Sequence, residues 1–299
     1  MTVRLRGLRW LRKRHPDLVD RARDRIVDSE RRLEPREGRT VDSFLWEHTR
    51  QVAAAAHRLC LREGTDPLIP VLCAVFHDMG KFEGGIYHKG DTPEEETAAA
   101  EAANMMRAEG LSPELVRKTE TALRSLYSTS ARSHAAADIV HDADFLVKSG
   151  RLGVAAFFSK SACRGRHMLN ALTESLSREL TYAAALPGNM RTEGARALAE
   201  RRALRTRAYY RGLLQEMREL GIARFEISRI AFPCPKRPDR NLSLYLASPS
   251  DCPLCGGEPR MKPLTVETGL KCDRLRAVFA CGSCGWENRI GFCLPEISS

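Results

Sequence analysis

Three segments that lie far apart in this chain carry histidine and aspartate side chains of the kind that bind divalent metals. The first contains His48, the second contains the adjacent pair His77 and Asp78, and the third contains Asp144. Imidazole nitrogens suit zinc, iron and nickel, and carboxylates suit magnesium and manganese, so a mixed set tolerates several ions. If one ion binds all four side chains, the fold has to bring these three segments together.

Hydrophobic periodicity predicts a run of helices over residues 41–221. Apolar residues recur at helical spacing around His48, and Gly64 is expected to end that helix. A second apolar run leads into His77, and Gly80 is expected to break that helix so that two consecutive side chains can reach one ion. Further helices are expected over residues 93–109, 113–127, 134–149, 154–160, 169–184 and 192–220. The low aromatic content, 6%, agrees with a mainly helical chain.

Periodicity leaves the fourth ligand open. Asp142 and Asp144 are two residues apart in an expected helix, so they face different ways and only one can serve. Lys81 follows Gly80 directly and would place a cation beside the ion, where it suits a substrate phosphate.

The order of these motifs resembles that of the HD superfamily of metal-dependent phosphohydrolases, over roughly residues 41–221. The resemblance is carried by His48, by the segment 76–81 (Phe-His-Asp-Met-Gly-Lys) and by the segment 143–146 (Ala-Asp-Phe-Leu). It implies an all-helical HD bundle and a mononuclear site, and it favours Asp144 over Asp142. The ligands it implies are His48, His77, Asp78 and Asp144.

The resemblance also implies the reaction. A divalent cation (Mn, Mg, Co, Ni, Fe or Zn) would activate a water that attacks phosphorus in a nucleotide or another small phosphorylated substrate. Asp78 would bind the ion and orient the water. Lys81, beside the ion, is expected to contact the substrate phosphate, and His88 is either a second contact to it or an ordinary loop residue. Two alternatives remain: a dinuclear iron HD-type oxygenase with His88 as a further ligand, and a nucleic-acid-binding or regulatory protein with a relict HD pocket.

Four of the ten cysteines form two C-x-x-C pairs, Cys252 with Cys255 and Cys281 with Cys284. Each pair is followed by a glycine that permits a tight turn, and four thiolates make a closed structural zinc site. Short β-prone runs surround them, and residues 233–238 look like a linker. Residues 222–299 therefore resemble a linker and a zinc-ribbon-like domain, whose zinc would stabilise a small β fold.

The net charge of +10 predicts polyanionic partners. Nucleic acid could bind through the basic ribbon, where Trp286 could stack on a base. Residues 1–40 read as a basic helical segment without the apolar core of a secretory signal, and no run of apolar residues is long enough to cross a membrane. We expect a cytoplasmic protein with no membrane partner.

Overall fold

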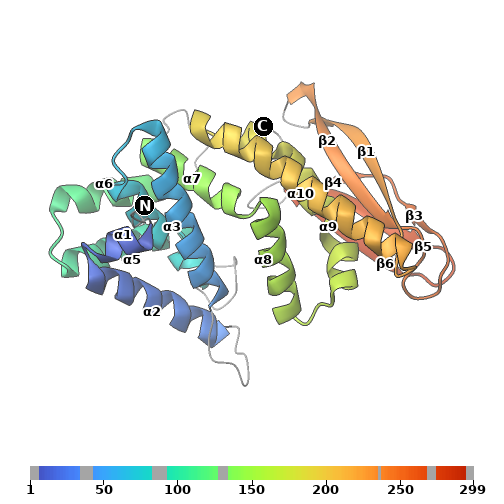
Figure 1. Cartoon of the computed structure of the whole chain (residues 1–299), viewed down its shortest axis with the longest axis horizontal. Coiled ribbons are helices and arrows are strands. Elements are labelled where there is room, and N and C mark those ends of the chain that lie inside the picture. The colour runs from blue at the N-terminus through green and yellow to red at the C-terminus, as the bar shows by residue number, and fades with distance from the viewer. Residues whose placement is uncertain are drawn as a thin grey trace. The chain divides into compact units, whose positions relative to one another are not determined.

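The computed structural model describes residues 7–33, 43–82, 93–126, 134–234, 237–267 and 274–293. Within these ranges the chain forms ten α-helices, one 3-10 helix and six β-strands, so the expected mainly helical class with a small C-terminal β module is confirmed (Figure 1). The chain divides into two compact units. The N-terminal unit comprises Met1–Val147 and Arg191–Ala195, and the C-terminal unit comprises Lys148–Met190 and Arg196–Ser299. The domain limits at residues 40/41 and 221/222 stay predictions.

Helices alone form the described part of the N-terminal unit up to Val147. Their bounds are α1 (Leu8–Arg12), α2 (Pro16–Leu33), α3 (Phe44–Glu63), α4 (Leu68–Phe76), the 3-10 helix η1 (Met79–Phe82), α5 (Glu94–Ala108), α6 (Pro113–Arg124) and α7 (Ala135–Val147). The basic N-terminal segment contributes to the core of this unit, because Leu11 and Leu18 are fully buried. Gly64 ends α3 in the left-handed conformation, as the sequence predicts.

Gly80 has a different role from the one expected. Helix α4 already ends at Phe76, and Gly80 lies inside η1, where a Cβ atom would overlap the carbonyl oxygen of Glu94. The residue is therefore required for the close approach of η1 and α5 and not for breaking a helix.

We expect Gly80→Ala to lower the free energy of unfolding by about 1–3 kcal/mol, because the added methyl group forces two backbone segments apart. Urea unfolding followed by circular dichroism would measure the change. Gly212→Ala is the matched control: Gly212 lies in a helix with open space around its Cβ position, so its replacement should be neutral or stabilising. A loss no larger than that of the control would contradict the steric role of Gly80.

The C-terminal unit combines helices with two antiparallel sheets. The helices are α8 (Gly150–Cys163), α9 (Met168–Asn189) and α10 (Glu193–Glu219), whose first turn belongs to the N-terminal unit. The strands are β1 (Phe225–Cys234), β2 (Arg237–Pro249), β3 (Pro259–Met261), β4 (Thr265–Glu267), β5 (Arg274–Cys281) and β6 (Glu287–Cys293). Strand β1 pairs with β2, and β5 pairs with β3, β4 and β6. The expectation of a linker over residues 233–238 is wrong, because β1 and β2 extend into this run and pair there.

Two hydroxyl groups on α9 join this helix to the backbone of β2. The Ser177 hydroxyl accepts a hydrogen bond from the amide of Ala247 at 2.8 Å and donates to its carbonyl oxygen at 3.3 Å. The Thr181 hydroxyl, one turn further, makes the same pair of bonds to Tyr245, at 2.9 and 3.3 Å. We call Ser177 and Thr181 the hydroxyl pair; it satisfies the edge of β2 that β1 does not cover.

Glu179 lies on α9 beside the buried Tyr210 of α10, and burial raises the pKa of its carboxyl to about 7. The folded state therefore keeps a proton that the unfolded chain loses near pH 4.5. The contribution of Glu179 to stability should be fully present below that pH and should be lost as the pH rises through about 7.

We expect Glu179→Gln to raise the free energy of unfolding by about 1–2 kcal/mol above neutral pH, and to change it little near pH 4.5. Urea unfolding at both pH values would measure the difference. Glu174→Gln, at an exposed position on the same helix, serves as the control. A pH-independent effect would show that the Glu179 carboxyl does not titrate as described.

Candidate metal centre

Elements of the N-terminal unit bring His48, His77, Asp78 and Asp144 together. His48 lies on the second turn of α3, His77 caps the C-terminus of α4, Asp78 follows it, and Asp144 lies near the end of α7. His77, Asp78 and Asp144 are at most 3% exposed. Buried charges need a partner of opposite charge or a metal, so this grouping is unusual for an ordinary core.

Three of these residues, His48, His77 and Asp78, form a group whose ligand atoms could hold one metal ion, and Asp144 lies beside it. Nε2 of His48, Nε2 of His77 and a carboxylate oxygen of Asp78 all lie within 4.8 Å of one another. Oδ1 of Asp144 lies 2.8 Å from Nε2 of His48 and 4.0 Å from Nε2 of His77. Two imidazoles and two carboxylates in this arrangement fit a divalent cation of the borderline class.

The orientation of His77 suits a metal ligand. Its Nδ1 lies 2.8 Å from the carbonyl oxygen of Ala74 and donates to it, which leaves Nε2 as the atom with a lone pair. This Nε2 is buried and has no hydrogen-bond partner among the described residues. Burial lowers the pKa of His77 more than the attraction of Asp78 and Asp144 raises it, so the ring is held neutral, the form that binds metals.

Lys81 points towards the same site. Its ammonium lies 2.6 Å from Oδ2 of Asp78, and its side chain is mostly buried. Burial alone would raise the pKa of the Asp78 carboxyl, but the His77 ring, once it is protonated at low pH, and the Lys81 ammonium outweigh burial and hold that pKa below its usual range. Asp78 is therefore an anion at every pH at which the protein would work.

The contacts of Asp142 and Asp144 differ in kind. The Asp142 carboxylate accepts hydrogen bonds from the amides of Arg191 and Thr192 and from the hydroxyl of Thr192, at 2.7–3.1 Å. It also lies 3.0 Å from Nδ1 of His141. Asp142 thus anchors the segment that leads into α10, while Asp144 faces His48. The sequence could not reveal this, because the partners of Asp142 come from a distant part of the chain.

Replacing each aspartate by alanine should separate these two roles. Asp142→Ala is expected to cost about 2–4 kcal/mol of stability, because it leaves several buried donors unsatisfied. Asp144→Ala should cost the metal-free protein much less and should lower metal affinity instead. Thermal unfolding and metal titration of both variants would test this. The reverse pattern would assign the ligand role to Asp142.

Among the residues that the structure describes, the group at this centre contains no histidine besides His48 and His77. His88 lies outside the described residues, so its roles as substrate contact or further ligand stay predictions. Nδ1 of His134 accepts a hydrogen bond from the amide of Ala136 at the start of α7. His57 is buried, and its ring packs edge-on against Trp10 at 5.2 Å.

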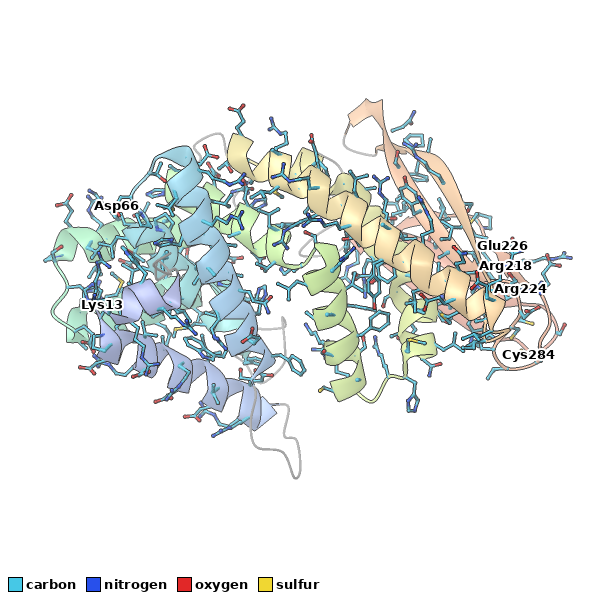
Figure 2. All side chains as sticks on the ribbon, viewed as in Figure 1. Lys13, Asp66, Arg218, Arg224, Glu226 and Cys284 are labelled. Carbon is cyan, nitrogen blue, oxygen red and sulfur yellow. The ribbon has the colours of Figure 1, made fainter. Side chains whose placement is uncertain are left out.

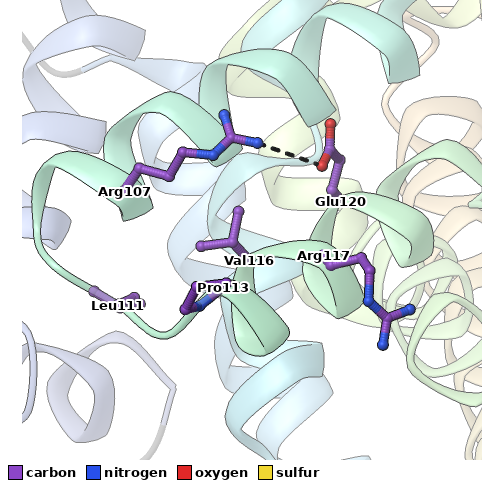
Figure 3. A pocket seen from close by; sticks show the side chains of 6 residues that line it. All are labelled: Arg107, Leu111, Pro113, Val116, Arg117 and Glu120. Atoms are coloured by element: carbon purple, nitrogen blue, oxygen red, sulfur yellow. Dashed lines mark ion pairs between the residues drawn. The ribbon is translucent and has the colours of Figure 1, made fainter.

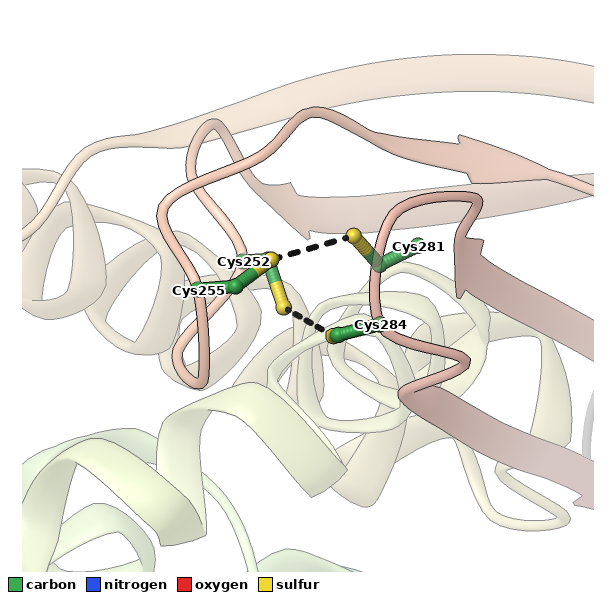
Figure 4. A group of neighbouring side chains, drawn as sticks. All are labelled: Cys252, Cys255, Cys281 and Cys284. Atoms are coloured by element: carbon green, nitrogen blue, oxygen red, sulfur yellow. Dashed lines mark hydrogen bonds between the residues drawn. The ribbon is translucent and has the colours of Figure 1, made fainter.

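The four cysteines of the C-x-x-C pairs form a second cluster, in the C-terminal unit (Figure 4). Sγ of Cys252 lies 3.6 Å from that of Cys284, and Sγ of Cys255 lies 3.5 Å from that of Cys281. Zinc–sulfur bonds of 2.3 Å in a tetrahedron place sulfur atoms about 3.8 Å apart. The cluster is therefore compatible with a zinc-ribbon module.

The backbone turns sharply after each pair of cysteines. Gly256 and Gly285 follow the two pairs with positive φ angles, which turn the chain back after each pair. Amide groups of Cys284 and Ser283 lower the pKa of Cys281 to about 6. The hydrogen bond from the amide of Trp286 would lower the pKa of Cys284, but the neighbouring thiols outweigh it and raise that pKa to about 12. Within the described residues, these two clusters are the ones whose ligand atoms could hold a metal.

A pocket of about 460 Å³ lies between α5 and α6, separate from both clusters (Figure 3). Arg107 and Arg117 point in different directions from its rim, and Arg107 faces Glu120 at 3.8 Å. The pocket shares no residue with the metal centre, and the geometry gives it no part in the chemistry of that centre.

Comparison with known proteins agrees with this arrangement. Residues 45–146 match the family model of the HD domain. The fold is similar to that of YpgQ from Bacillus subtilis, with a TM-score of 0.50 and 20% identity over 68% of this chain and 94% of that one. A predicted HD superfamily hydrolase from an uncultured Thermotogales bacterium has a TM-score of 0.48 and 20% identity, over 67% and 91% of the two chains. No curated protein matches the sequence. No helix in the described ranges is long and apolar enough to span a membrane.

Proposed function

We propose that this chain, which carries an HD domain over residues 45–146 and has the helical fold of HD-superfamily proteins, is a metal-dependent phosphohydrolase. Its substrate would be a nucleotide or another small phosphorylated compound. The observation that carries the proposal is the buried convergence of two imidazoles and two carboxylates with a lysine beside them. An ordinary core does not concentrate five polar side chains without a use for them.

Each residue of the site has a proposed role in the reaction. His48, His77, Asp78 and Asp144 would hold the ion. A divalent cation supplies there a Lewis acid for a phosphoryl oxygen and lowers the pKa of a water molecule. Ala74 holds the His77 ring so that Nε2 faces the site. Lys81 would bind a non-bridging phosphate oxygen and keep Asp78 ionised. In the reaction a water oxygen forms a bond to phosphorus, the bond to the leaving oxygen breaks, and that oxygen takes up a proton.

The first experiment is a release assay. Phosphate and pyrophosphate would be measured with nucleotides and phosphomonoesters, each with manganese, magnesium, cobalt or nickel, for the wild type and for Asp78→Asn. Release by the wild type alone would support the hydrolase and identify the substrate class. No release from folded, metal-loaded wild type would contradict the proposal and favour a binding protein with a relict pocket or, if oxygen is consumed with iron, the oxygenase.

A further inference from the structure

The positive charge of this protein lies in its C-terminal unit. That unit has 24 lysine and arginine residues and 13 acidic residues, whereas the N-terminal unit has 24 and 25. The chain's net charge of +10 therefore arises from one unit of +11 and one of −1. A strongly basic unit joined to a nearly neutral one is the electrostatic pattern of a polyanion-binding protein.

Helix α10 concentrates this charge. Between Glu200 and Glu216 it has five arginines and no acidic residue. The helix buries its apolar side, including Ala203 and Tyr210, in its own unit. The whole helix has seven arginines. Arg196 and Arg202 donate hydrogen bonds to the carbonyl oxygens of Met190 and Ser149, and of the other five, four are exposed and one is half-buried. We call these five the arginine strip: Arg201, Arg205, Arg207, Arg211 and Arg218.

The arginine strip has no partner in the described chain. None of its five guanidinium groups makes an ion pair or hydrogen bond to a residue in the described ranges. Several arginines of the N-terminal unit differ from these: Arg12, Arg50 and Arg124 each pair with a carboxylate within 3 Å. Like charges one turn apart on a helix repel each other, so the strip costs stability unless an outside anion binds it.

The zinc ribbon, where the sequence placed a nucleic-acid site, is less suited to this task. Lys262 and Arg289 both pair with Glu287, and Arg276 pairs with Glu267. Trp286 packs against the hydrophobic cluster of the sheet, so its ring already has a structural role.

We propose that the arginine strip of α10 binds the phosphodiester backbone of a nucleic acid. From Arg201 to Arg218 the helix runs for about 25 Å, which is the length of several successive phosphates. Small residues, Ala197, Ala208 and Gly212, lie among the arginines on the exposed surface and allow close approach of a backbone. The binding would be independent of base sequence, because guanidinium groups that contact only phosphates do not distinguish one base from another.

A membrane surface fits α10 less well. A helix that lies in a lipid interface presents a broad apolar face to it. Tyr210 and Met217 of α10 are buried in a hydrophobic cluster of its own unit. Between Arg201 and Arg218 the exposed large hydrophobic residues are Leu204 and Tyr209, which are too few for a broad apolar face.

The test is fluorescence anisotropy with the full-length protein and labelled duplex DNA, duplex RNA and single-stranded RNA of about 30 nucleotides. The wild type should bind at least one of these, with an affinity that falls steeply between about 50 and about 200 mM salt. Replacing Arg201, Arg205, Arg211 and Arg218 together by glutamine should reduce the slope of log K against log salt by about 3–4 and weaken binding by at least about 100-fold at low salt.

The control removes the same charge from other exposed arginines of the C-terminal unit: Arg151, Arg224, Arg260 and Arg274. Arg218 and Arg224, labelled in Figure 2, come from the strip and from the control set. Circular dichroism and thermal unfolding would show that both variants fold, and pairs of substitutions replace the fourfold variant if it does not. Equal losses in the two variants, absence of wild-type binding, or binding only to vesicles of phosphatidylcholine and phosphatidylserine would each overturn the proposal.

Discussion

Asp78→Asn is expected to abolish metal binding at the HD site and to lower kcat/KM for phosphate release by about 10³-fold or more. Asparagine keeps the shape of the side chain but removes the negative charge that both the ion and Lys81 need. Metal content after dialysis, metal titration by calorimetry and the release assay would measure the two losses separately. Asp28→Asn, at an exposed position of the same unit, controls for the change of charge.

Because Asp78 forms an ion pair with Lys81, its replacement is also expected to lower the stability of the protein, and this effect has to be separated from the loss of metal. Asparagine at position 78 leaves the lysine ammonium mostly buried without its anion, which destabilises the fold. The double variant Asp78→Asn/Lys81→Met removes both charges and should recover stability without recovering metal or activity. Activity within tenfold of the wild type in a folded, metal-free Asp78→Asn protein would show that this site is not the catalytic centre.

The second large effect is expected from Cys281→Ser. A serine hydroxyl does not replace a thiolate as a zinc ligand, and structural zinc contributes on the order of 10 kcal/mol to the folding of small domains. The variant should lose the zinc of the four-cysteine cluster, and strands β3 to β6 should unfold at a much lower temperature. Zinc analysis and the fluorescence of Trp286, in a Trp10→Phe/Trp46→Phe background, would follow both changes.

Cys163→Ser provides the matched control for this prediction. Cys163 is a half-buried cysteine of the same unit and belongs to neither cluster. Its replacement should leave zinc content and the melting of the strands unchanged. If Cys281→Ser retains zinc and the wild-type melting temperature, the cluster is not a structural metal site.

Much of the fold follows from patterns within short segments. Helical periodicity and end signals such as Gly64 depend on neighbours along the chain, so the sequence alone reveals them. The candidate ligands could be chosen because the order of their motifs along the chain resembles that of the HD superfamily. Strand β3 has three residues, and the pairing of both β3 and β6 with β5 depends on residues elsewhere in the chain, so local patterns do not reveal it.

The roles that the sequence missed all depend on tertiary contacts. Gly80 looked like a helix breaker because a glycine's local effect is visible, whereas the nearby backbone of Glu94 is not. Asp142 and Asp144 could not be separated by periodicity, since the amides that bind Asp142 belong to residues some fifty positions later. The packing of α9 on β2 could not be predicted for a similar reason. The positions of a serine and a threonine in a helical sequence do not indicate which backbone groups their hydroxyls will bind.

The hydroxyl pair of Ser177 and Thr181 determines where this protein can be divided. A two-stranded ribbon such as β1–β2 is barely stable in water by itself, and here α9 supplies the partner groups for its second edge. A fragment that starts after α10 would expose those amides and carbonyls to any passing strand and would be prone to aggregate. Recombinant or evolutionary exchange of the zinc-ribbon region therefore has to carry α9 along with the strands.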